Sequence, residues 1–280
     1  MSVNRHIIFK TNDDIILKPS RFIDLKELWR YRELLITFTW RDLKVKYKQT
    51  ILRILWAFIP PFLSMIVFTI IFGEFLKVPS EGIPYPLFVY TGTLIWNFFS
   101  TSLNNSSASL VSHGSMINKI YFPRLVLPLS SVLSGLVDFF IAFGILVLLM
   151  FYFQIFPSVI GIIILPVLLF ITVLSALGIG LFLAALNVRY RDVKFMLPFF
   201  IQLGFFVTPV VYPTQILEEW AFILWLNPMT CVIETIRSGL LGTGAINWEF
   251  LILSLILSLI YFAVGMFYFQ MSEKEFADIM

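Results

Sequence analysis

The chain has 280 residues, of which 59% are hydrophobic and 13% are charged, and its mean hydropathy is +0.91. A soluble domain carries about 25% charged residues, so this composition excludes a soluble protein and predicts an integral membrane protein. The apolar residues fall into blocks of roughly 18 to 29 rather than into short alternating segments, which predicts helices and excludes an outer-membrane barrel.

Residues 1–53 are predicted to form a cytoplasmic strap and an amphipathic interface helix. Asp24 and Glu27 have the spacing of a capping box, and Trp, Leu and Ile recur on one helical face after them. A helix lying along the cytoplasmic membrane surface fits this pattern, and a helix packed on the spans of its own chain is the alternative. A basic cluster precedes the first apolar block and comprises Arg41, Lys44, Lys46, Lys48 and Arg53.

Six apolar segments each approach the length of about 20 residues that crosses the hydrocarbon core. They lie near 54–76, 86–111, 128–152, 159–186, 195–212 and 248–269. These segments predict a six-helix transmembrane domain over 54–270 and a cytoplasmic tail over 271–280. If both termini are inside, 18 of the 20 Lys and Arg residues are cytoplasmic, and Lys77 and Arg237 are the exceptions. Cytoplasmic loops are enriched in Lys and Arg, so this asymmetry predicts that both termini are cytoplasmic.

Polar residues inside the predicted spans need partners. The second span carries Asn97, Thr101 and Asn104 at helical spacing, which favours packing against other helices slightly over lining a wet cavity. Asp138 is the ionisable residue deep inside a span, and we expect it to bond to a neighbouring helix, with an ion-relay role as the alternative. The fourth span has small residues that permit close packing, and these are Ala176, Gly180 and Ala184.

The segment 213–247 between the fifth and sixth spans is too apolar for a solvated loop. It contains two short amphipathic stretches separated by Asn227-Pro228, and each is too short to cross the membrane. We expect two external re-entrant helices, buried in protein or beside a cavity. Glu234 and Arg237, three positions apart, are expected to pair. The residues predicted for an external gate are Trp225, Asn227, Pro228, Glu234 and Arg237.

The sequence lacks the patterns of several kinds of catalytic site. It has no GxxxxGK[ST] loop, so the chain is not expected to bind nucleotide phosphates itself. His6 and His113 are isolated and are expected to be solvated loop residues rather than metal ligands. Asp13-Asp14 precedes Ile-Ile-Leu and does not form an aspartate-rich diphosphate–magnesium motif. We therefore expect no catalytic residues, no metal site and no cofactor bound by this chain.

Several stretches together resemble the membrane subunit of ATP-binding-cassette exporters of bacterial surface polysaccharides, the O-antigen, capsule and teichoic-acid class. The resemblance covers nearly the whole chain. It rests on YRELLITFTWRDLKVKYKQTILRILWAFIPP (31–61), INKIYFPRLVLP (117–128), NVRYRDV (187–193), TPVVYP (208–213) and WLNPMTCVIETIRSGL (225–240). Leu52-Arg53 departs from the Leu-Gly that the family commonly has before the Trp.

The resemblance implies a homodimer of this subunit with two copies of a separate ATPase, which would bind ATP and magnesium. It also implies a location in the bacterial inner membrane and no nucleic-acid partner. Two cytoplasmic loops look like the coupling elements that contact the ATPase, while helix-capping turns that face lipid headgroups are the alternative. Their residues are Tyr121, Phe122, Arg124, Tyr190, Arg191 and Asp192.

The implied substrate is a glycan on a polyprenyl diphosphate. The five cations Arg41, Lys44, Lys46, Lys48 and Arg53 are predicted to form its entrance, and anchoring to anionic lipid explains them equally well. Aromatic rings present flat apolar faces to sugars, although packing or an interface belt also accounts for each ring. The predicted pathway comprises Trp56, Phe58, Phe62, Phe199, Phe205, Phe206 and Tyr212. The alternatives for function are a drug or lipid exporter of the same fold and a membrane-embedded glycosyl or prenyl transferase.

Overall fold

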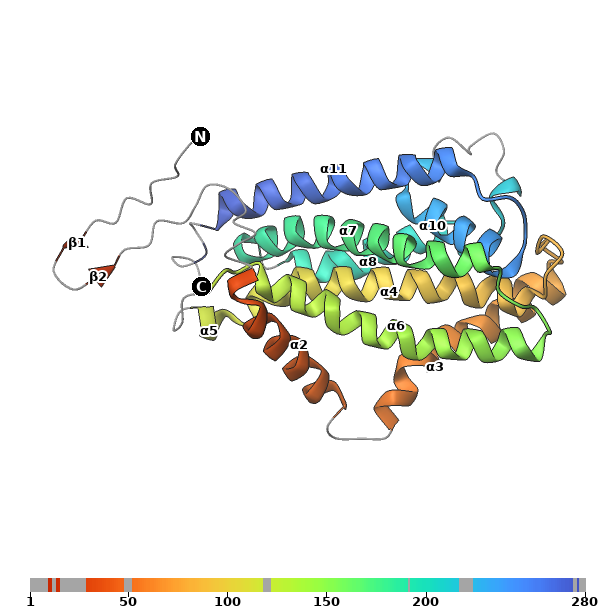
Figure 1. Cartoon of the computed structure of the whole chain (residues 1–280), viewed down its shortest axis with the longest axis horizontal. Coiled ribbons are helices and arrows are strands. Elements are labelled where there is room, and N and C mark those ends of the chain that lie inside the picture. Colours follow the sequence, from red (N-terminus) through yellow and green to blue (C-terminus); the bar gives the residue numbers. More distant parts are fainter. Residues whose placement is uncertain are drawn as a thin grey trace.

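Four long helices lie side by side along the long axis of the molecule (Figure 1). The computed structural model describes residues 10–11, 14–15, 29–47, 52–117, 122–190, 192–216, 224–273 and 276. The long helices are α4 (Tyr85–Ser112), α6 (Val126–Tyr152), α7 (Val159–Arg189) and α11 (Trp248–Ser272). α7 packs against both α4 and α11, and α4 also packs against α6. One antiparallel pair of two-residue strands, β1 (Lys10–Thr11) and β2 (Asp14–Ile15), accompanies the helices. The predicted helical class is confirmed.

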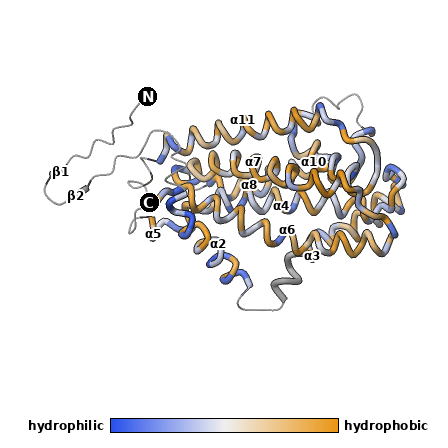
Figure 2. The backbone as a smooth tube through the Cα atoms, in the orientation of Figure 1, coloured by the Kyte–Doolittle hydropathy of each residue, from blue (hydrophilic) through white to orange (hydrophobic). Residues whose placement is uncertain are grey.

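Three helices in the described part of the chain, α6, α7 and α11, are long and apolar enough to cross a membrane. Figure 2 shows hydrophobic residues along the helices and hydrophilic residues mainly toward their ends. Large apolar side chains such as Phe140, Ile163 and Phe170 are exposed on the bundle, and a soluble monomer rarely exposes apolar patches of this kind. These features support a membrane protein, and the full set of six spans stays a prediction.

The first and fifth predicted spans are shorter or less regular than expected. α3 (Leu52–Phe68) contains Pro60 and Pro61 and continues as a π-helix, η1 (Thr69–Phe75). α8 (Val193–Val207) ends five residues before the predicted boundary. Thr208, which precedes Pro209, has an extended backbone, because the proline ring disfavours a helical conformation at the residue before it.

The N-terminal helix α2 (Arg32–Tyr47) packs against α6 rather than only lying on a membrane surface. Phe38 is 3% exposed and makes an edge contact with Phe122, with the ring centroids 5.7 Å apart. Ile36 and Trp40 remain exposed on the same helix. One face of α2 therefore packs on its own chain, as the alternative predicts, and another face stays exposed, as expected for a helix on a membrane surface. The predicted capping box at Asp24 lies outside the described residues.

Small residues hold α7 close to its neighbours. A Cβ atom added to Gly180 would lie 2.6 Å from Ser106 Oγ on α4, which confirms the predicted close packing at this position. A Cβ atom on Gly265 of α11 would overlap the carbonyl oxygen of Gly178 on α7. The buried face of α4 is rich in serine, and Asn187 Nδ2 donates to the carbonyl of Ser107 at 3.2 Å. The polar half of α4 is thus partly a helix-packing surface.

Candidate functional site

The second short amphipathic stretch of 213–247 forms a buried helix at one end of the bundle (Figure 1). It comprises α10 (Pro228–Ile236) and a π-helical turn, η3 (Arg237–Leu241), which pack against α7 and α4. Most of the first stretch, residues 217–223, lies outside the described residues. The predicted helix is confirmed for α10, and its re-entrance into the membrane stays a prediction.

Arg237 is fully buried within the segment 213–247. Its Nη1 donates to the carbonyl of Pro209 at 2.9 Å, and its Nη2 donates to the carbonyls of Val210 at 2.6 Å and Phe88 at 3.2 Å. The guanidinium also lies over the Phe88 ring, with Cζ 3.6 Å from the centroid. One side chain therefore ties together η3, the start of α4 and the turn that follows α8.

The charge of Arg237 is partly balanced inside the protein. Nη1 lies 3.5 Å from Glu234 Oε1, which confirms the predicted pairing of these two residues. Burial lowers the pKa of Arg237 to about 10, so the guanidinium stays charged at neutral pH. Burial raises the pKa of Glu234, and the neighbouring guanidinium opposes that change. A Cβ atom on Gly92 would lie 2.6 Å from Arg237 Nη2, so a glycine makes room for the guanidinium.

Asn227 starts α10 in the manner of an N-cap residue. Its Oδ1 accepts from the backbone N–H of Met229 at 3.0 Å, and Pro228 occupies the first helical turn, where a missing N–H costs no hydrogen bond. Its Nδ2 donates to Thr208 Oγ1 at 2.8 Å. The amide thus joins the helix start to the turn that Arg237 binds.

Trp225 and Phe250 stack face to face beside this segment, with ring centroids 3.8 Å apart. They border a cavity of about 170 Å³ that Glu81, Glu234 and several hydroxyl groups also line. All five residues predicted for the gate therefore lie in one packed region. The sequence did not reveal the carbonyl partners of Arg237, because their proximity depends on the turn after α8 folding back onto α4.

The residues predicted to contact an ATPase separate into buried and exposed groups. Phe122 is 5% exposed and packs against α2, whereas Tyr190 is 56% exposed and Asp192 is also exposed. Arg124 donates to the carbonyl of Glu273 and lies over the ring of Phe276, with Cζ 5.5 Å from the centroid. Tyr121 and Arg191 lie outside the described residues. Of the predicted coupling residues that the structure describes, Tyr190 and Asp192 are therefore the exposed ones.

The predicted basic entrance does not form one uniform cluster in the described part. Arg41 pairs with Asp42 at 2.9 Å and its Nη2 lies 2.5 Å from Nε2 of His113. Lys44 lies over the Trp40 ring, with Nζ 5.6 Å from the centroid, and Lys46 pairs with an acid on another helix. Lys48 and the side chain of Arg53 lie outside the described residues.

His113 corrects the expectation of a solvated loop residue. It is partly buried at the end of α4, and its Nδ1 lies 2.8 Å from the carbonyl of Ser109. Contact with that carbonyl places a proton on Nδ1 and leaves Nε2 to accept from Arg41. The imidazole therefore joins α4 to α2, a contact that an isolated histidine in a sequence does not indicate.

Asp138 of α6 has the partners that its position inside a span required. Lys46 Nζ donates to its Oδ2, and the Tyr47 hydroxyl donates to its Oδ1. Burial, together with the hydrogen bond to Asp138, raises the pKa of Tyr47, so this hydroxyl stays protonated. The predicted bond to a neighbouring helix is confirmed, and the helix is α2.

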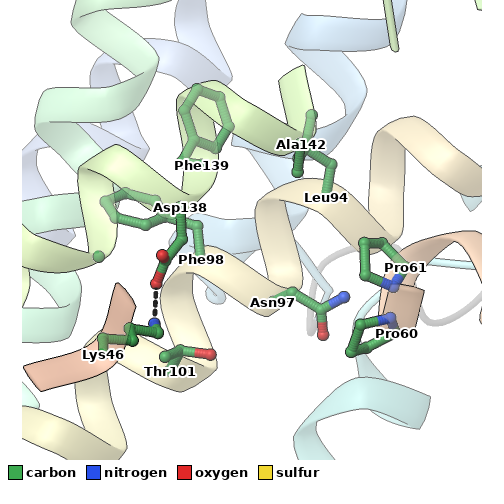
Figure 3. A pocket seen from close by; sticks show the side chains of 11 residues that line it. Lys46, Pro60, Pro61, Leu94, Asn97, Phe98, Thr101, Asp138, Phe139 and Ala142 are labelled. Atoms are coloured by element: carbon green, nitrogen blue, oxygen red, sulfur yellow. Dashed lines mark hydrogen bonds and ion pairs between the residues drawn. The ribbon is translucent and has the colours of Figure 1, made fainter. Parts of the chain in front are cut away.

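A cavity of about 380 Å³ opens beside this ion pair, between α2, α3, α4 and α6 (Figure 3). Asn97 and Thr101 of α4 line it, and Asn104 is exposed. The predicted helix packing is therefore confirmed for the serines of this span, while two of the predicted polar residues line a cavity whose hydration stays a prediction.

The aromatic residues predicted for a pathway occupy different environments. Phe205 is partly buried, and its ring stacks on Phe68 with centroids 5.5 Å apart. Phe199 and Phe206 of α8 are exposed. The Tyr212 hydroxyl donates to the carbonyl of Phe206 at 3.0 Å. Phe62 is partly buried against the core, and the side chains of Trp56 and Phe58 lie outside the described residues.

Comparison with known proteins agrees with this helical architecture. The ABC-2 type transporter family matches residues 33–241. An O-antigen export system permease protein RfbA of Klebsiella pneumoniae is 30% identical over 249 residues, which cover 89% of this chain and 95% of the relative. The RfbA protein of Myxococcus xanthus is 29% identical over 258 residues, 91% of this chain and 98% of the relative.

A more distant relative is the polysialic acid transport protein KpsM of Escherichia coli. It is 22% identical over 211 residues, which cover 72% of this chain and 78% of the relative. The family match includes α2, the helices from α3 to α8, α10 and the Arg237 region. From this match and the full-length similarity to the permeases, the chain belongs to the ABC-2 type transporter family.

Proposed function

We propose that the chain is the permease subunit of an ATP-driven exporter that moves lipid-linked polysaccharide of the O-antigen type outward across the bacterial inner membrane. The observation that carries this proposal is its similarity to O-antigen export permeases over about nine-tenths of its length. The relatives named above are transport proteins, and none is a drug exporter or a transferase.

The proposed complex contains two copies of this chain and two copies of a separate ATPase. ATP and magnesium would be bound by that ATPase, and the exposed Tyr190 and Asp192 would contribute to the surface that contacts it. Both loops before α6 and before α8 lie at the end of the bundle that we assign to the cytoplasm. The cation asymmetry of the sequence supports this orientation.

The second copy of the chain would pack on α3 and α8. α8 has 15 residues, which at 1.5 Å per residue span about 22 Å, less than the hydrocarbon thickness of about 30 Å. A short apolar helix is stabilised when it joins other helices instead of facing lipid alone. The exposed Phe199, Phe206 and Leu63 supply apolar surface for this contact, and the glycan would pass beside it.

The six spans and the external re-entrant segment complete the proposed transport unit. α10 and the Trp225 region would close the outer end of the path, and the contacts of Arg237 support a rigid closing element. The basic residues at the end of α2 would attract the diphosphate or anchor the chain to anionic lipid. The two roles act at the same membrane surface.

Deletion of the gene in its native host tests the proposal. Loss of surface polysaccharide, accumulation of lipid-linked glycan inside the cell and restoration by the wild-type gene are expected. Unchanged surface polysaccharide in the deletion strain would refute polysaccharide export. Turnover of a polyprenyl substrate by the purified chain without ATPase would instead establish a transferase. Co-purification with an ATPase, followed by a hydrolysis assay with the glycan, tests the partner separately.

A further inference from the structure

The cavity beside Asp138 has the size and the two-sided lining of a binding site for an amphiphile. Its volume of about 380 Å³ falls within the range of roughly 300 to 1,000 Å³ that is common for ligand pockets. Its apolar lining comprises Pro60, Pro61, Leu94, Phe98, Phe139 and Ala142, and its polar lining comprises Lys46, Asn97, Thr101 and Asp138. Figure 3 shows Lys46, Asp138 and Thr101 on one side of the space, with Lys46 and Asp138 joined, and Asn97 beside Pro60 and Pro61.

The cavity lies where membrane lipid can reach it. Asp138 is near the middle of α6, about 18 Å from Val126 at 1.5 Å per residue. Val137 and Phe140, its neighbours on α6, are exposed apolar residues, as expected for a surface that faces acyl chains. α2 reaches the cavity from the end of the bundle where α5 (Gly114–Ile117) lies (Figure 1). We assign that end to the cytoplasm.

The polar side of the cavity carries one positive and one negative group. The Lys46 side chain is 41% exposed and the Asp138 side chain is 16% exposed, so neither group is sealed from the cavity. The Tyr47 hydroxyl holds the second carboxylate oxygen. Asn97 and Thr101 add an amide and a hydroxyl that both donate and accept hydrogen bonds. The charges on this wall sum to zero, and the two charged groups are adjacent.

We propose that this cavity binds a membrane phospholipid whose zwitterionic headgroup carries a primary amine. The phosphate would accept from Lys46 and Thr101, and the ammonium group would donate to Asp138. The acyl chains would lie along the apolar wall and continue into the bilayer beside α6. The ligand's negative phosphate and positive ammonium group are therefore complementary to the one cation and the one carboxylate of the wall.

Charge complementarity separates this ligand from two others. A diphosphate headgroup would bring at least two negative charges to a wall with one cation that already has a carboxylate beside it. Uncompensated charge is costly at this depth in a membrane. A choline headgroup has no N–H to donate to Asp138. The cavity therefore favours an amine-bearing phospholipid over both a polyprenyl diphosphate and a phosphatidylcholine.

Native mass spectrometry of the full chain in detergent tests this assignment. The chain is mixed with equal amounts of phosphatidylethanolamine, phosphatidylglycerol and phosphatidylcholine, and the lipid that remains bound is counted. Wild type should retain phosphatidylethanolamine about tenfold better than phosphatidylglycerol, the factor that a charge-assisted hydrogen bond supplies. Asp138→Asn should lower this ratio at least tenfold, because the wall then carries a net positive charge.

Two further variants separate lipid binding from loss of structure. Thr101→Phe fills the cavity from an exposed position and leaves the Lys46 and Asp138 pair unchanged, so it should abolish retention of the bound lipid. Glu249→Gln removes a carboxylate from the first turn of α11, away from the cavity, and should leave the lipid ratio unchanged. The unfolding temperature of each variant is measured, and lipid binding is compared at the same number of degrees below that temperature.

Three results would overturn the proposal. The first is an equal lipid ratio in wild type and Asp138→Asn. The second is full retention of lipid in Thr101→Phe. The third is displacement of phosphatidylethanolamine by farnesyl diphosphate at a lower concentration than by phosphatidylglycerol, which would assign the cavity to a diphosphate lipid. None of these results depends on transport activity, so they leave the proposed export function untouched.

Discussion

Replacing Arg237 with methionine tests whether one buried guanidinium holds α10 and η3 in place. Methionine has a similar length and apolar stem but no donor. The carbonyls of Phe88, Pro209 and Val210 would each lose a hydrogen bond inside the protein. α10 would then be held by its apolar contacts and by Asn227.

The magnitude follows from these lost bonds. A buried polar group left without a partner costs about 1 to 3 kcal/mol, and removing one partner of a buried ion pair costs about 3 to 5 kcal/mol. Glu234 offsets part of this cost, because burial raises its pKa and favours its neutral form once Arg237 is gone. We therefore expect a loss of about 3 kcal/mol in the free energy of local opening, a factor of roughly 150 in its equilibrium constant.

The single cysteine of the chain provides the assay. Cys231 lies on α10 and is buried, and burial raises the pKa of its thiol. Reaction with a maleimide dye therefore requires the segment to open, and its rate follows the opening equilibrium when closing is fast. The Arg237→Met rate should exceed wild type by about two orders of magnitude. Cys231→Ser provides the background, and Lys77→Met provides a matched removal of the other cation that is predicted to be external.

Equal labelling rates in wild type and Arg237→Met would refute the reasoning. An increase of the same size in Lys77→Met would also refute it, because the effect would then belong to external charge in general. An intermediate rate in Arg237→Lys is expected, since an ammonium keeps the charge but cannot reach three carbonyls in the planar arrangement of a guanidinium.

Three smaller predictions follow from other contacts. Asn227→Ala removes an N-cap worth about 1 kcal/mol and should raise the labelling rate about fivefold; an unchanged rate would show that the cap is dispensable. Gly265→Leu forces a side chain against Gly178 and should lower the unfolding temperature clearly, whereas Gly144→Leu, which has open space, should not; equal shifts would contradict the close approach of α7 and α11. Tyr190→Ala should leave the unfolding temperature unchanged but reduce co-purified ATPase at least tenfold, and unaltered recovery would remove Tyr190 from the proposed contact.

Much of the helical architecture could be predicted from local patterns. The long apolar blocks around α6, α7 and α11 indicate spanning helices because backbone groups in lipid must bond within their own segment. The position of Asp138 within such a block predicted a bonding partner, and the structure supplies Lys46 and Tyr47. The spacing of Glu234 and Arg237 predicted their pairing. Each of these predictions depends either on residues that are close in sequence or on the cost of placing polar groups in the hydrocarbon of the membrane.

Other features depend on which segments meet in space. The wrong boundary of the fifth span came from extending hydropathy through Pro209, although the restriction before a proline was readable at Thr208. The resemblance predicts that Phe122 contacts an ATPase from a cytoplasmic loop, and the structure packs it against Phe38 of α2. The sequence predicts a solvated His113, and the structure places it against Arg41. A single sequence contains no direct signal for these pairings.

Composition and local pattern were enough to predict a helical membrane protein, a cytoplasmic side for most of its cations, and a partner for the carboxylate within a span. Each follows from the cost of placing polar groups in hydrocarbon, which depends on composition along a segment. The folded chain shows in addition that α2 provides that partner, that Arg237 joins three separate segments, and that a cavity with one cation and one carboxylate opens between α2 and α6. Those arrangements arise from contacts between residues far apart in the chain, and packing geometry selects them.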